Sequence, residues 1–305
     1  MPSPVAAPGQ VVVSVKAASV NFPDVLIIEN KYQFKPALPF SPGSELAGVV
    51  KEVGPGVTQV QPGDRVMAFT IYGAFAQEIA LDVERVLPIP DGMDYPTAAA
   101  LLLTYGTMDH ALRDRGALSA EDTVLVLGAA GGIGIASIEI ARALGARVIA
   151  CASTDEKLHA CREHGADEVI NYAAEDLRER IKTLTRGRGV NVIVDPVGGP
   201  FTEPALRSIA WRGRLLVVGF AAGEIPKIPL NLVLLKGCAI VGVFWGDFVR
   251  REPAAFAASV DQLGAWYREG RLKPHIAATY PLARAADAIK RMAAREAIGK
   301  LVVMP

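Results

Sequence analysis

The amino-acid sequence predicts an α/β protein with a doubly wound parallel sheet and a partly open, β-barrel-like part. The first observation is the stretch TVLVLGAAGGIG over 123–134, where a short apolar run ends in small residues. The second observation is alternation: a helical pattern and a second apolar run, RVIACAS, follow, and strand and helix patterns then alternate as far as CAIVGVF. The third observation is a series of short Val-rich runs before residue 90, separated by turns that contain Gly and Pro. Together they predict βαβ repetition in the middle of the chain and a small barrel before it.

The barrel-like part comes first in the chain. Its predicted strands are VVVSV, ELAGVVKEV, DRVMAF, FAQEIAL and RVLPI. Turn signals such as Gly54-Pro55-Gly56 and Pro62-Gly63-Asp64 separate them. A helical stretch over 95–115 then leads into the parallel sheet.

The small residues at the end of TVLVLGAAGGIG predict a dinucleotide-binding, or Rossmann, turn. Gly131 and Gly134 hold the second and third positions of the glycine fingerprint, and Ala129 holds the first. The N-terminus of the following helix offers N–H groups and a positive dipole end to a diphosphate. We expect four consecutive residues of this turn to bind the cofactor: Ala130, Gly131, Gly132 and Ile133.

The end of the second strand indicates which dinucleotide is bound. NAD-binding units usually carry an acid there for the ribose 2′-hydroxyl, but this strand ends in Cys-Ala-Ser-Thr. Ser153, Lys157 and Tyr172 offer a hydroxyl, an ammonium and a phenol that suit a 2′-phosphate, so we predict NADPH. The alternative is a capping box over 153–156 with Lys157 as a solvated charge. Both interpretations can hold together, because a capped helix start also binds anions.

The segment after residue 243 predicts a return to the first part. It contains helical patterns near 254–269 and 283–295, a short run near 279, and the strand KLVVMP. These elements are too few for an independent α/β domain. We therefore expect a barrel-like domain over 1–102, a Rossmann domain over 103–242 and a C-terminal return over 243–305.

Composition excludes several classes of protein. The chain has 32 basic and 32 acidic residues, so its charge indicates neither a nucleic acid nor an anionic membrane as partner. The sequence contains no charge-free apolar run of 18 residues and no signal-peptide pattern at its start. Cys151, Cys161 and Cys238 are too scattered for a disulfide framework or a metal cluster. We expect a cytoplasmic protein.

Several motifs occur in order along nearly the whole chain: SVNFPDVLI, PGSELAGVVKEVG, PGDRV, GAAGGIG, INY, DPVGG, VVGF and GKLVV. In these motifs and in their order, the chain resembles the medium-chain dehydrogenase/reductase superfamily, and in particular its zinc-independent NADPH:quinone oxidoreductase branch. Members of that branch begin with a further strand or hairpin before the position of Val11. The resemblance therefore implies either a barrel that lacks its first N-terminal strands or a truncated start.

The resemblance also bears on zinc. Zinc-dependent relatives carry Cys where this chain has Asn21 and His where it has Ser44, and they carry a four-Cys lobe that this sequence lacks. An amide and a hydroxyl are poor zinc ligands. The histidines do not form a spaced ligand set either; they are His110, His159, His164 and His275. We predict no metal.

The resemblance implies the remaining site residues. Asn21 lies near the nicotinamide ribose and the substrate, and Tyr32, eleven residues later, flanks the reacting substrate. Tyr32 resembles the proton donor of enoyl-thioester reductases in this superfamily. The expected cofactor contacts are Thr107, Gly219, Phe220, Phe244, Trp245 and Lys300.

Each of these residues also has a structural interpretation. Tyr32 could plug the barrel mouth, and Asn21 could satisfy a turn. The three aromatic residues could belong to the core, Thr107 could line a helix, and Lys300 could be a solvated charge.

The resemblance implies an NADPH-dependent reductase of a quinone or another conjugated carbonyl that works without metal. The alternative within the same superfamily is an enoyl-thioester reductase acting on an acyl-CoA. A basic rim for the CoA phosphates would favour this alternative; its candidates are Arg113, Arg115, Arg250 and Arg251. An alternative of another class is a non-catalytic NADPH-binding structural protein. The segment GCAIVGVFW corresponds to the edge strand through which relatives pair, which predicts a homodimer.

Overall fold

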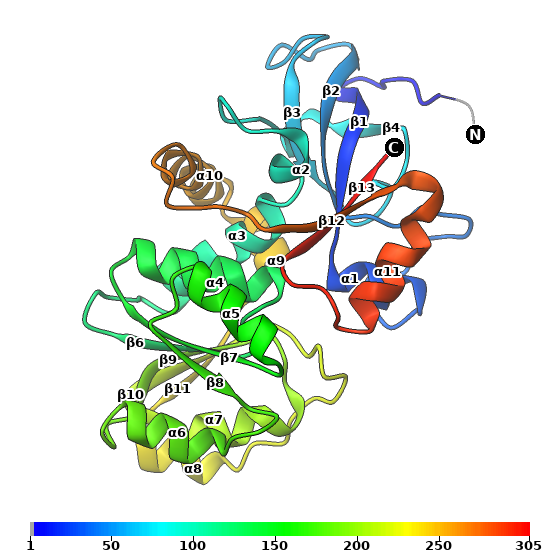
Figure 1. Ribbon diagram of the computed structural model, residues 1–305. Coiled ribbons are helices and arrows are strands. Elements are labelled where there is room, and N and C mark those ends of the chain that lie inside the picture. Colours follow the sequence, from blue (N-terminus) through cyan, green and yellow to red (C-terminus); the bar gives the residue numbers. More distant parts are fainter. Residues whose placement is uncertain (1–2) are drawn as a thin grey trace. The chain divides into compact units, whose positions relative to one another are not determined.

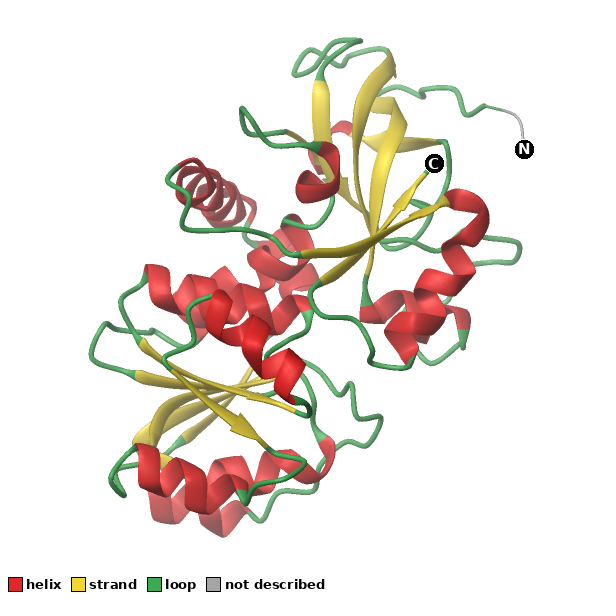
Figure 2. Cartoon of the chain, viewed as in Figure 1, coloured by secondary structure: helices red, strands yellow, loops and turns green. Residues whose placement is uncertain are grey.

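The structure, a computed structural model, describes residues 3–305 and contains two compact units (Figure 1; Figure 2). The first unit comprises the residues up to Leu103 together with Pro274–Pro305, and the second comprises Thr104–Lys273. The chain therefore leaves the second unit after Lys273, whereas the sequence placed the start of the return at 243. The intervening helices α9 (Trp245–Arg251) and α10 (Pro253–Arg268) belong to the second unit. In α10, the Ser259 hydroxyl donates to the buried Asp109 carboxylate at 2.5 Å.

The first unit is built on a mixed sheet with the strand order β12-β13-β1-β2-β3-β5. Its strands are β1 (Gln10–Val20), β2 (Glu45–Val53), β3 (Arg65–Phe69), β4 (Glu78–Asp82), β5 (Val86–Pro88), β12 (Ile276–Pro281) and β13 (Lys300–Met304). The long strand β1 changes partners: its first half pairs with β4, its last residues pair with β13, and β2 pairs along most of it. All five strands predicted for this part of the chain are present.

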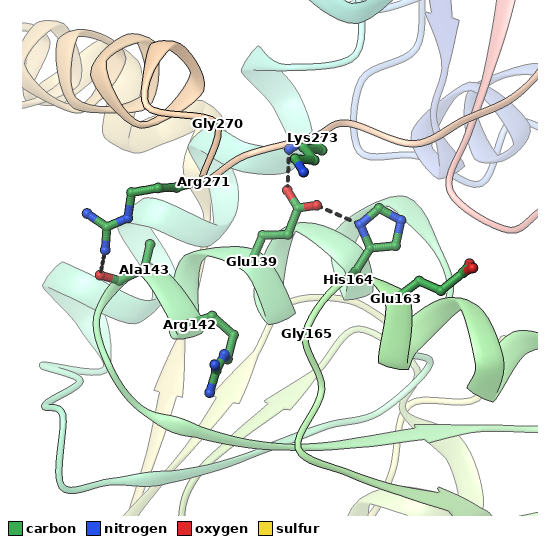
Figure 3. A pocket seen from close by; sticks show the side chains of 9 residues that line it. All are labelled: Glu139, Arg142, Ala143, Glu163, His164, Gly165, Gly270, Arg271 and Lys273. Carbon is green, nitrogen blue, oxygen red and sulfur yellow. Dashed lines mark hydrogen bonds and ion pairs between the residues drawn. The ribbon is translucent and has the colours of Figure 1, made fainter.

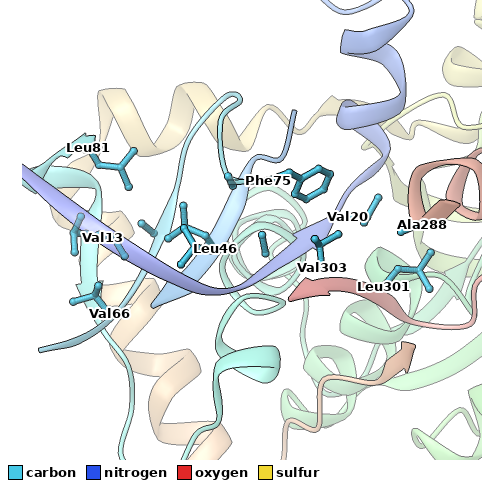
Figure 4. Close-up of a cluster of buried hydrophobic side chains, with 14 of the residues drawn as sticks. Val13, Val20, Leu46, Val66, Phe75, Leu81, Ala288, Leu301 and Val303 are labelled. Atoms are coloured by element: carbon cyan, nitrogen blue, oxygen red, sulfur yellow. The ribbon is translucent and has the colours of Figure 1, made fainter. Parts of the chain in front are cut away.

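The core of the first unit lies against β1, β2 and β13 (Figure 4). Val11, Val13 and Val15 belong to this cluster, because alternate residues of a strand point to the same face. Leu301 and Val303 join the cluster from β13, and Ala288 and Ile289 from helix α11 (Ala285–Ala293). The two distant segments of the first unit therefore share one hydrophobic core.

Helix α1 (Phe22–Ile28) follows β1 directly. Pro23 stands in its first turn, where the missing N–H costs nothing. The carboxylate of Asp24 accepts the N–H of Asn21, the residue that precedes the helix, at 2.8 Å. This short-range bond is half of a capping box, and it ties the start of the helix to the end of β1. Helices α2 (Tyr95–Ala98) and α3 (Leu102–Asp109) lead to the second unit.

The second unit contains an all-parallel sheet with the order β11-β10-β9-β6-β7-β8. Its strands are β6 (Thr123–Val126), β7 (Arg147–Ala152), β8 (Glu168–Asn171), β9 (Val190–Asp195), β10 (Ile209–Val217) and β11 (Ala239–Gly242). The order reverses between β6 and β9, as in a doubly wound dinucleotide-binding sheet. The predicted fold class, a Rossmann sheet plus a second sheet domain, is confirmed.

Helices cover both faces of this parallel sheet. Figure 1 shows α4 (Gly132–Ala143) and α5 (Asp155–Glu163) on one face, and α6 (Leu177–Leu184), α7 (Thr202–Arg207) and α8 (Leu230–Lys236) on the other. Strands covered on both faces are apolar throughout, which explains runs such as Val-Leu-Val in β6. Throughout residues 3–305, every helix is too short or too polar to cross a membrane.

Candidate functional site

Most of the residues predicted to bind the cofactor follow strands of the parallel sheet; Thr107, in α3, and Lys300, in the first unit, do not. Because the strands are parallel, their carboxyl ends meet at one edge of the sheet. The glycine turn follows β6, Ser153 follows β7, Tyr172 follows β8, and the Gly219-Phe220 pair follows β10. Phe244 and Trp245 come after β11. The sheet therefore brings together side chains and backbone from five strands at the edge where such sheets bind ligands.

The glycine turn is open at Gly131 and closely packed at Gly134. Gly131 precedes helix α4, and a Cβ atom built on it would meet only the carbonyl oxygen of Gly128, at 3.6 Å. A Cβ atom on Gly134 would lie 2.3 Å from the carbonyl oxygen of Ala129. Gly131 thus leaves room beside the helix N-terminus, whereas Gly134 lets the helix pack closely on the turn.

Ser153 and Lys157 lie side by side after β7. The Lys157 ammonium donates to the Ser153 hydroxyl at 3.5 Å. The capping box expected over 153–156 is wrong by one residue, because Thr154 precedes α5 and its hydroxyl accepts the N–H of Lys157 at 3.3 Å. Ser153 is therefore not the capping residue. The Tyr172 ring packs on Phe201, with the ring centroids 4.5 Å apart.

The aromatic residues after β10 and β11 differ in exposure. Trp245 is buried, packs edge-on against Phe256 and lies on Gly106, where a Cβ atom would come within 2.9 Å of the indole nitrogen. Its ring is therefore part of the core of the second unit. Phe244 is exposed, and Phe220 is half-buried beside Gly198. Thr107 is buried in α3, next to Gly106.

In the first unit, the sheet register builds a buried polar cluster that we call the Asn21 cluster: Ser19, Asn21, Asp24, Glu45 and Lys300. Ser19 pairs with Glu45 across β1 and β2, and Val20 pairs with Leu301 across β1 and β13. Lys300 therefore comes opposite Asn21. Its ammonium donates to the Asn21 amide oxygen at 2.5 Å and lies 3.6 Å from the Glu45 carboxylate.

Hydrogen bonds satisfy the other polar atoms of this cluster. Glu45 accepts from the Ser19 hydroxyl at 2.6 Å and from the backbone N–H of Leu103 at 2.9 Å. The amide nitrogen of Asn21 donates to the Ser19 hydroxyl at 3.1 Å and reaches Glu45 at 3.4 Å. Asp24 accepts from the backbone of Asn21 at 2.8 Å and of Gly43 at 3.2 Å.

The charges of the Asn21 cluster are strongly perturbed. Burial raises the pKa of Asp24 to about 7, against the opposing effects of the Asn21 N–H, the Lys300 charge, and the Gly43 and Ser44 hydrogen bonds. Burial also lowers the pKa of Lys300, while the carboxylates of Glu45 and Asp24 oppose that shift. One ammonium thus faces two carboxyl groups, of which one titrates near neutral pH.

Tyr32 lies in the loop after α1, half-buried, with its ring 5.9 Å from that of Phe34. Burial raises the pKa of its phenol, the charge of Asp24 raises it further, and a hydrogen bond with Gln33 opposes both. Asp24 is thus a member of the Asn21 cluster whose charge acts on the Tyr32 phenol. A phenol in this setting stays protonated at neutral pH and remains a hydrogen-bond donor.

One interpretation from the sequence is wrong. Lys300 is not a solvated charge, because only 3% of it is exposed. Three further members of the Asn21 cluster were not predicted from the sequence: Ser19, Asp24 and Glu45. Asp24 could have been found from its position three residues after Asn21, a capping spacing. Glu45 could not have been placed without the register between β1 and β2.

The second unit also contains a pocket that is separate from the glycine turn (Figure 3). It has a volume of about 400 Å³ and lies where α4 and α5 end, whereas the glycine turn lies where α4 begins. The buried Glu139 carboxylate accepts from the backbone of Lys273 at 2.8 Å and lies 2.6 Å from the ring of His164. No residue predicted for the site lines this pocket, and its polar contacts anchor the segment over 270–273 to α4.

Possible metal ligands are dispersed in the described part of the chain. Within residues 3–305, no group of three or more His, Cys, Asp or Glu side chains is arranged to hold a metal ion. Position 21 carries an amide and position 44 a hydroxyl, and zinc prefers neither.

Two protein families match the chain, one in each unit. Residues 7–91 match the family described as "Alcohol dehydrogenase GroES-like domain". Residues 132–263 match the family described as "Zinc-binding dehydrogenase". The order of the two matches is the order of the two sheets along the chain.

Similar proteins cover nearly the whole chain. The "Quinone oxidoreductase-like protein 2 homolog" of Nematostella vectensis is 41% identical over 96% of this chain and 81% of its own length. The "Quinone oxidoreductase" of Pseudomonas aeruginosa is 34% identical over 98% of this chain and 92% of its own. The crystal structure of Escherichia coli quinone oxidoreductase complexed with NADPH superimposes with a TM-score of 0.94 at 28% identity. It covers 100% of this chain and 94% of that one.

Proposed function

Because the chain belongs to the quinone oxidoreductase-like family of the medium-chain dehydrogenase/reductase superfamily, we propose that it is an NADPH-dependent reductase of quinones or other conjugated carbonyl compounds. The superfamily predicted from the motifs is confirmed by these matches. The main observation that supports this proposal is at the carboxyl edge of the parallel sheet. The open turn at Gly131 follows one strand there, and the Lys157–Ser153 pair follows the next.

The residues at this edge fit a dinucleotide. The turn over Ala130–Ile133 offers backbone N–H groups to the diphosphate, and Gly131 has no side chain to block it. In this proposal the ribose edge of the cofactor is bound by Ser153, Lys157 and Tyr172. The nicotinamide side is bound by Thr107, Gly219, Phe220 and Phe244. Trp245 contributes through its backbone, since its ring is buried. NADPH, when bound, supplies a hydride to the acceptor.

The related Escherichia coli structure contains NADPH, and the Lys157–Ser153 pair supports the same cofactor here. Charge-assisted hydrogen bonds to a 2′-phosphate contribute about 1.5–3 kcal/mol each before solvent reduces them. Lys157→Ala should therefore weaken NADPH binding roughly tenfold or more and leave NADH binding nearly unchanged. Lys182→Ala, an exposed lysine of the same unit, is the control. Equal losses for both cofactors in a binding titration would show that Lys157 is only a surface charge.

The Asn21 cluster supplies the substrate side in the first unit. Asn21 and Tyr32 flank the reacting compound, and the protonated phenol donates a hydrogen bond or a proton to the oxygen or carbon that becomes negative. A quinone or a conjugated carbonyl is already electron-poor, so this reaction requires orientation and exclusion of water rather than a Lewis acid. No metal takes part in the proposed reaction.

The decisive experiment is steady-state NADPH oxidation with ortho- and para-quinones, enones, enals and enoyl-CoAs. Turnover of quinones or enones above the rate without protein is the expected result. Turnover confined to enoyl-CoAs would identify the enoyl-thioester reductase instead. NADPH binding without turnover of any acceptor would identify a non-catalytic NADPH-binding protein.

The proposed enzyme is a homodimer that pairs through β11. This strand ends the parallel sheet, so one of its edges is available for pairing. Large apolar side chains are exposed on β11 and α8 and at the neighbouring end of β10: Trp211, Leu230, Leu234, Leu235 and Ile240. Such a patch beside an open strand edge matches a second copy of the same surface.

A further inference from the structure

The Asn21 amide is held in one orientation. An ammonium has donors only, so Lys300 must face the amide oxygen of Asn21 and not its nitrogen. The amide nitrogen has two hydrogens, and three acceptors of the first unit surround it: the Ser19 hydroxyl at 3.1 Å, the Ser19 carbonyl oxygen at 3.3 Å and the Glu45 carboxylate at 3.4 Å. If the amide were flipped, its NH2 group would face the Lys300 ammonium, and two donor groups would oppose each other.

This orientation decides what Asn21 can offer to a ligand. Both donors of the amide nitrogen are engaged within the first unit, so none remains for a substrate carbonyl. The amide oxygen has two lone pairs, and Lys300 uses one of them. The group left to a ligand is therefore an acceptor, which suits a hydroxyl group.

The position of Lys300 is itself fixed by the fold. Its backbone N–H donates to the carbonyl oxygen of His275 at 2.8 Å, and it begins β13, which pairs with β1. Gly299, just before it, has φ +76°, and a Cβ atom there would lie 2.4 Å from the same carbonyl oxygen. Its ammonium is 3.6 Å from Glu45, which offsets the cost of burying it.

We propose that Lys300 is a positioning residue for Asn21. It fixes the amide so that Asn21 accepts a hydrogen bond from a ligand hydroxyl, such as a ribose hydroxyl of the cofactor, and does not donate to the substrate carbonyl. Lys300 thus acts through Asn21 and not by contact with the cofactor. This inference rests on the proposed function for the identity of the cofactor.

A double-mutant cycle with NADPH as the probe tests the proposal. The variants are Asn21→Ala, Lys300→Met and the double variant; Lys290→Met, an exposed lysine of the same unit, is the control. The Kd for NADPH is measured by fluorescence titration without a substrate, and the KM for 1,4-benzoquinone is measured separately. Loss of one hydrogen bond should raise the Kd about five- to tenfold in each single variant.

The expected result is strong coupling. The double variant should bind NADPH no more weakly than Asn21→Ala, because Lys300 has no further effect once the amide is absent. The KM for benzoquinone should change less than about threefold, while the control stays at wild-type values. Additive losses in the cycle, or a loss confined to the quinone KM, would overturn the proposal.

Two further measurements distinguish a failure of this proposal from unfolding of a variant and from a failure of the proposed function. Lys300→Met leaves Glu45 and Asp24 without their cation, so Lys300→Met with Glu45→Gln provides a neutral pair if the single variant unfolds. Wild-type protein that binds NADPH but reduces no acceptor would contradict the proposed function and leave the binding cycle intact. Wild-type protein that does not bind NADPH would overturn both.

Discussion

Asp24 links the Asn21 cluster to pH. Its pKa in the folded protein, about 7, is above the usual value of 3.8 because burial disfavours the carboxylate. The folded state then binds the proton more tightly than the unfolded state. The contribution of the Asp24 proton to the free energy of unfolding is complete below about pH 4 and is lost as the pH rises through about 7. The difference between the two pKa values corresponds to at most about 4 kcal/mol.

Asp24→Asn should therefore flatten the pH dependence of the free energy of unfolding. The asparagine cannot accept both backbone N–H groups, so the variant should be less stable than wild type at about pH 5. The difference should shrink or reverse at about pH 8. Urea unfolding at both pH values measures it, with Asp82→Asn, at an exposed position of the same unit, as the control. Parallel wild-type and Asp24→Asn profiles would show that Asp24 titrates normally.

Tyr32 distinguishes the two kinds of acceptor. Reduced quinone oxygens take protons from water readily, so Tyr32→Phe should leave quinone reduction within about threefold of wild type. An enoyl substrate needs an acid more, and its turnover should fall roughly 10²-fold. Tyr72→Phe, at an exposed tyrosine of the same unit, should change neither rate. If Tyr32→Phe leaves every substrate unaffected, Tyr32 only packs in the loop and is not part of the site.

At the scale of elements, the glycine turn before α4 gives a paired prediction. Gly134→Ala places a Cβ atom 2.3 Å from the backbone of Ala129, so it should lower the free energy of unfolding by about 1–3 kcal/mol. Gly131→Ala meets no atom closer than 3.6 Å and should keep the wild-type melting temperature, yet lose NADPH binding. Thermal unfolding and a cofactor titration on both variants measure the two effects. A Gly131→Ala variant that binds NADPH normally would contradict the assignment of this turn.

Periodicity predicted the strands well, because each buried strand is a short apolar run between turn residues. It missed α1, α8 and α9, which are seven residues each and too short to show a helical pattern. In α8, Leu230, Leu234 and Leu235 are exposed, so its sequence has no polar face to mark a helix. The residues at the carboxyl edge of the parallel sheet could be placed from the sequence, because they follow strands directly. The Asn21 cluster was not, because pairing between β1 and β13 brings Lys300 to Asn21.

At the scale of the whole molecule, the exposed patch on β11 and α8 predicts the assembly. Leu234 is 79% exposed and Ile240 lies on the edge strand. Leu234→Asp with Ile240→Lys should convert a dimer into monomers in light scattering at micromolar concentration. Leu38→Lys, which replaces a leucine 84% exposed in the first unit, should remain dimeric. Wild-type protein that is already monomeric would contradict the dimer.

The pairing of β1 with β13 imposes an order on folding while the chain is being synthesised. Asn21 and Lys300 are 279 residues apart, whereas the second unit is one continuous segment between them. At roughly 5–20 residues per second, a ribosome needs on the order of 15–60 seconds to make the 279 residues from Asn21 to Lys300. For much of this time β1 is outside the exit tunnel, and its last partner strand, β13, does not yet exist. Until then β1 can pair only with β2 and β4, so the continuous second unit can complete its parallel sheet before the first unit completes its own.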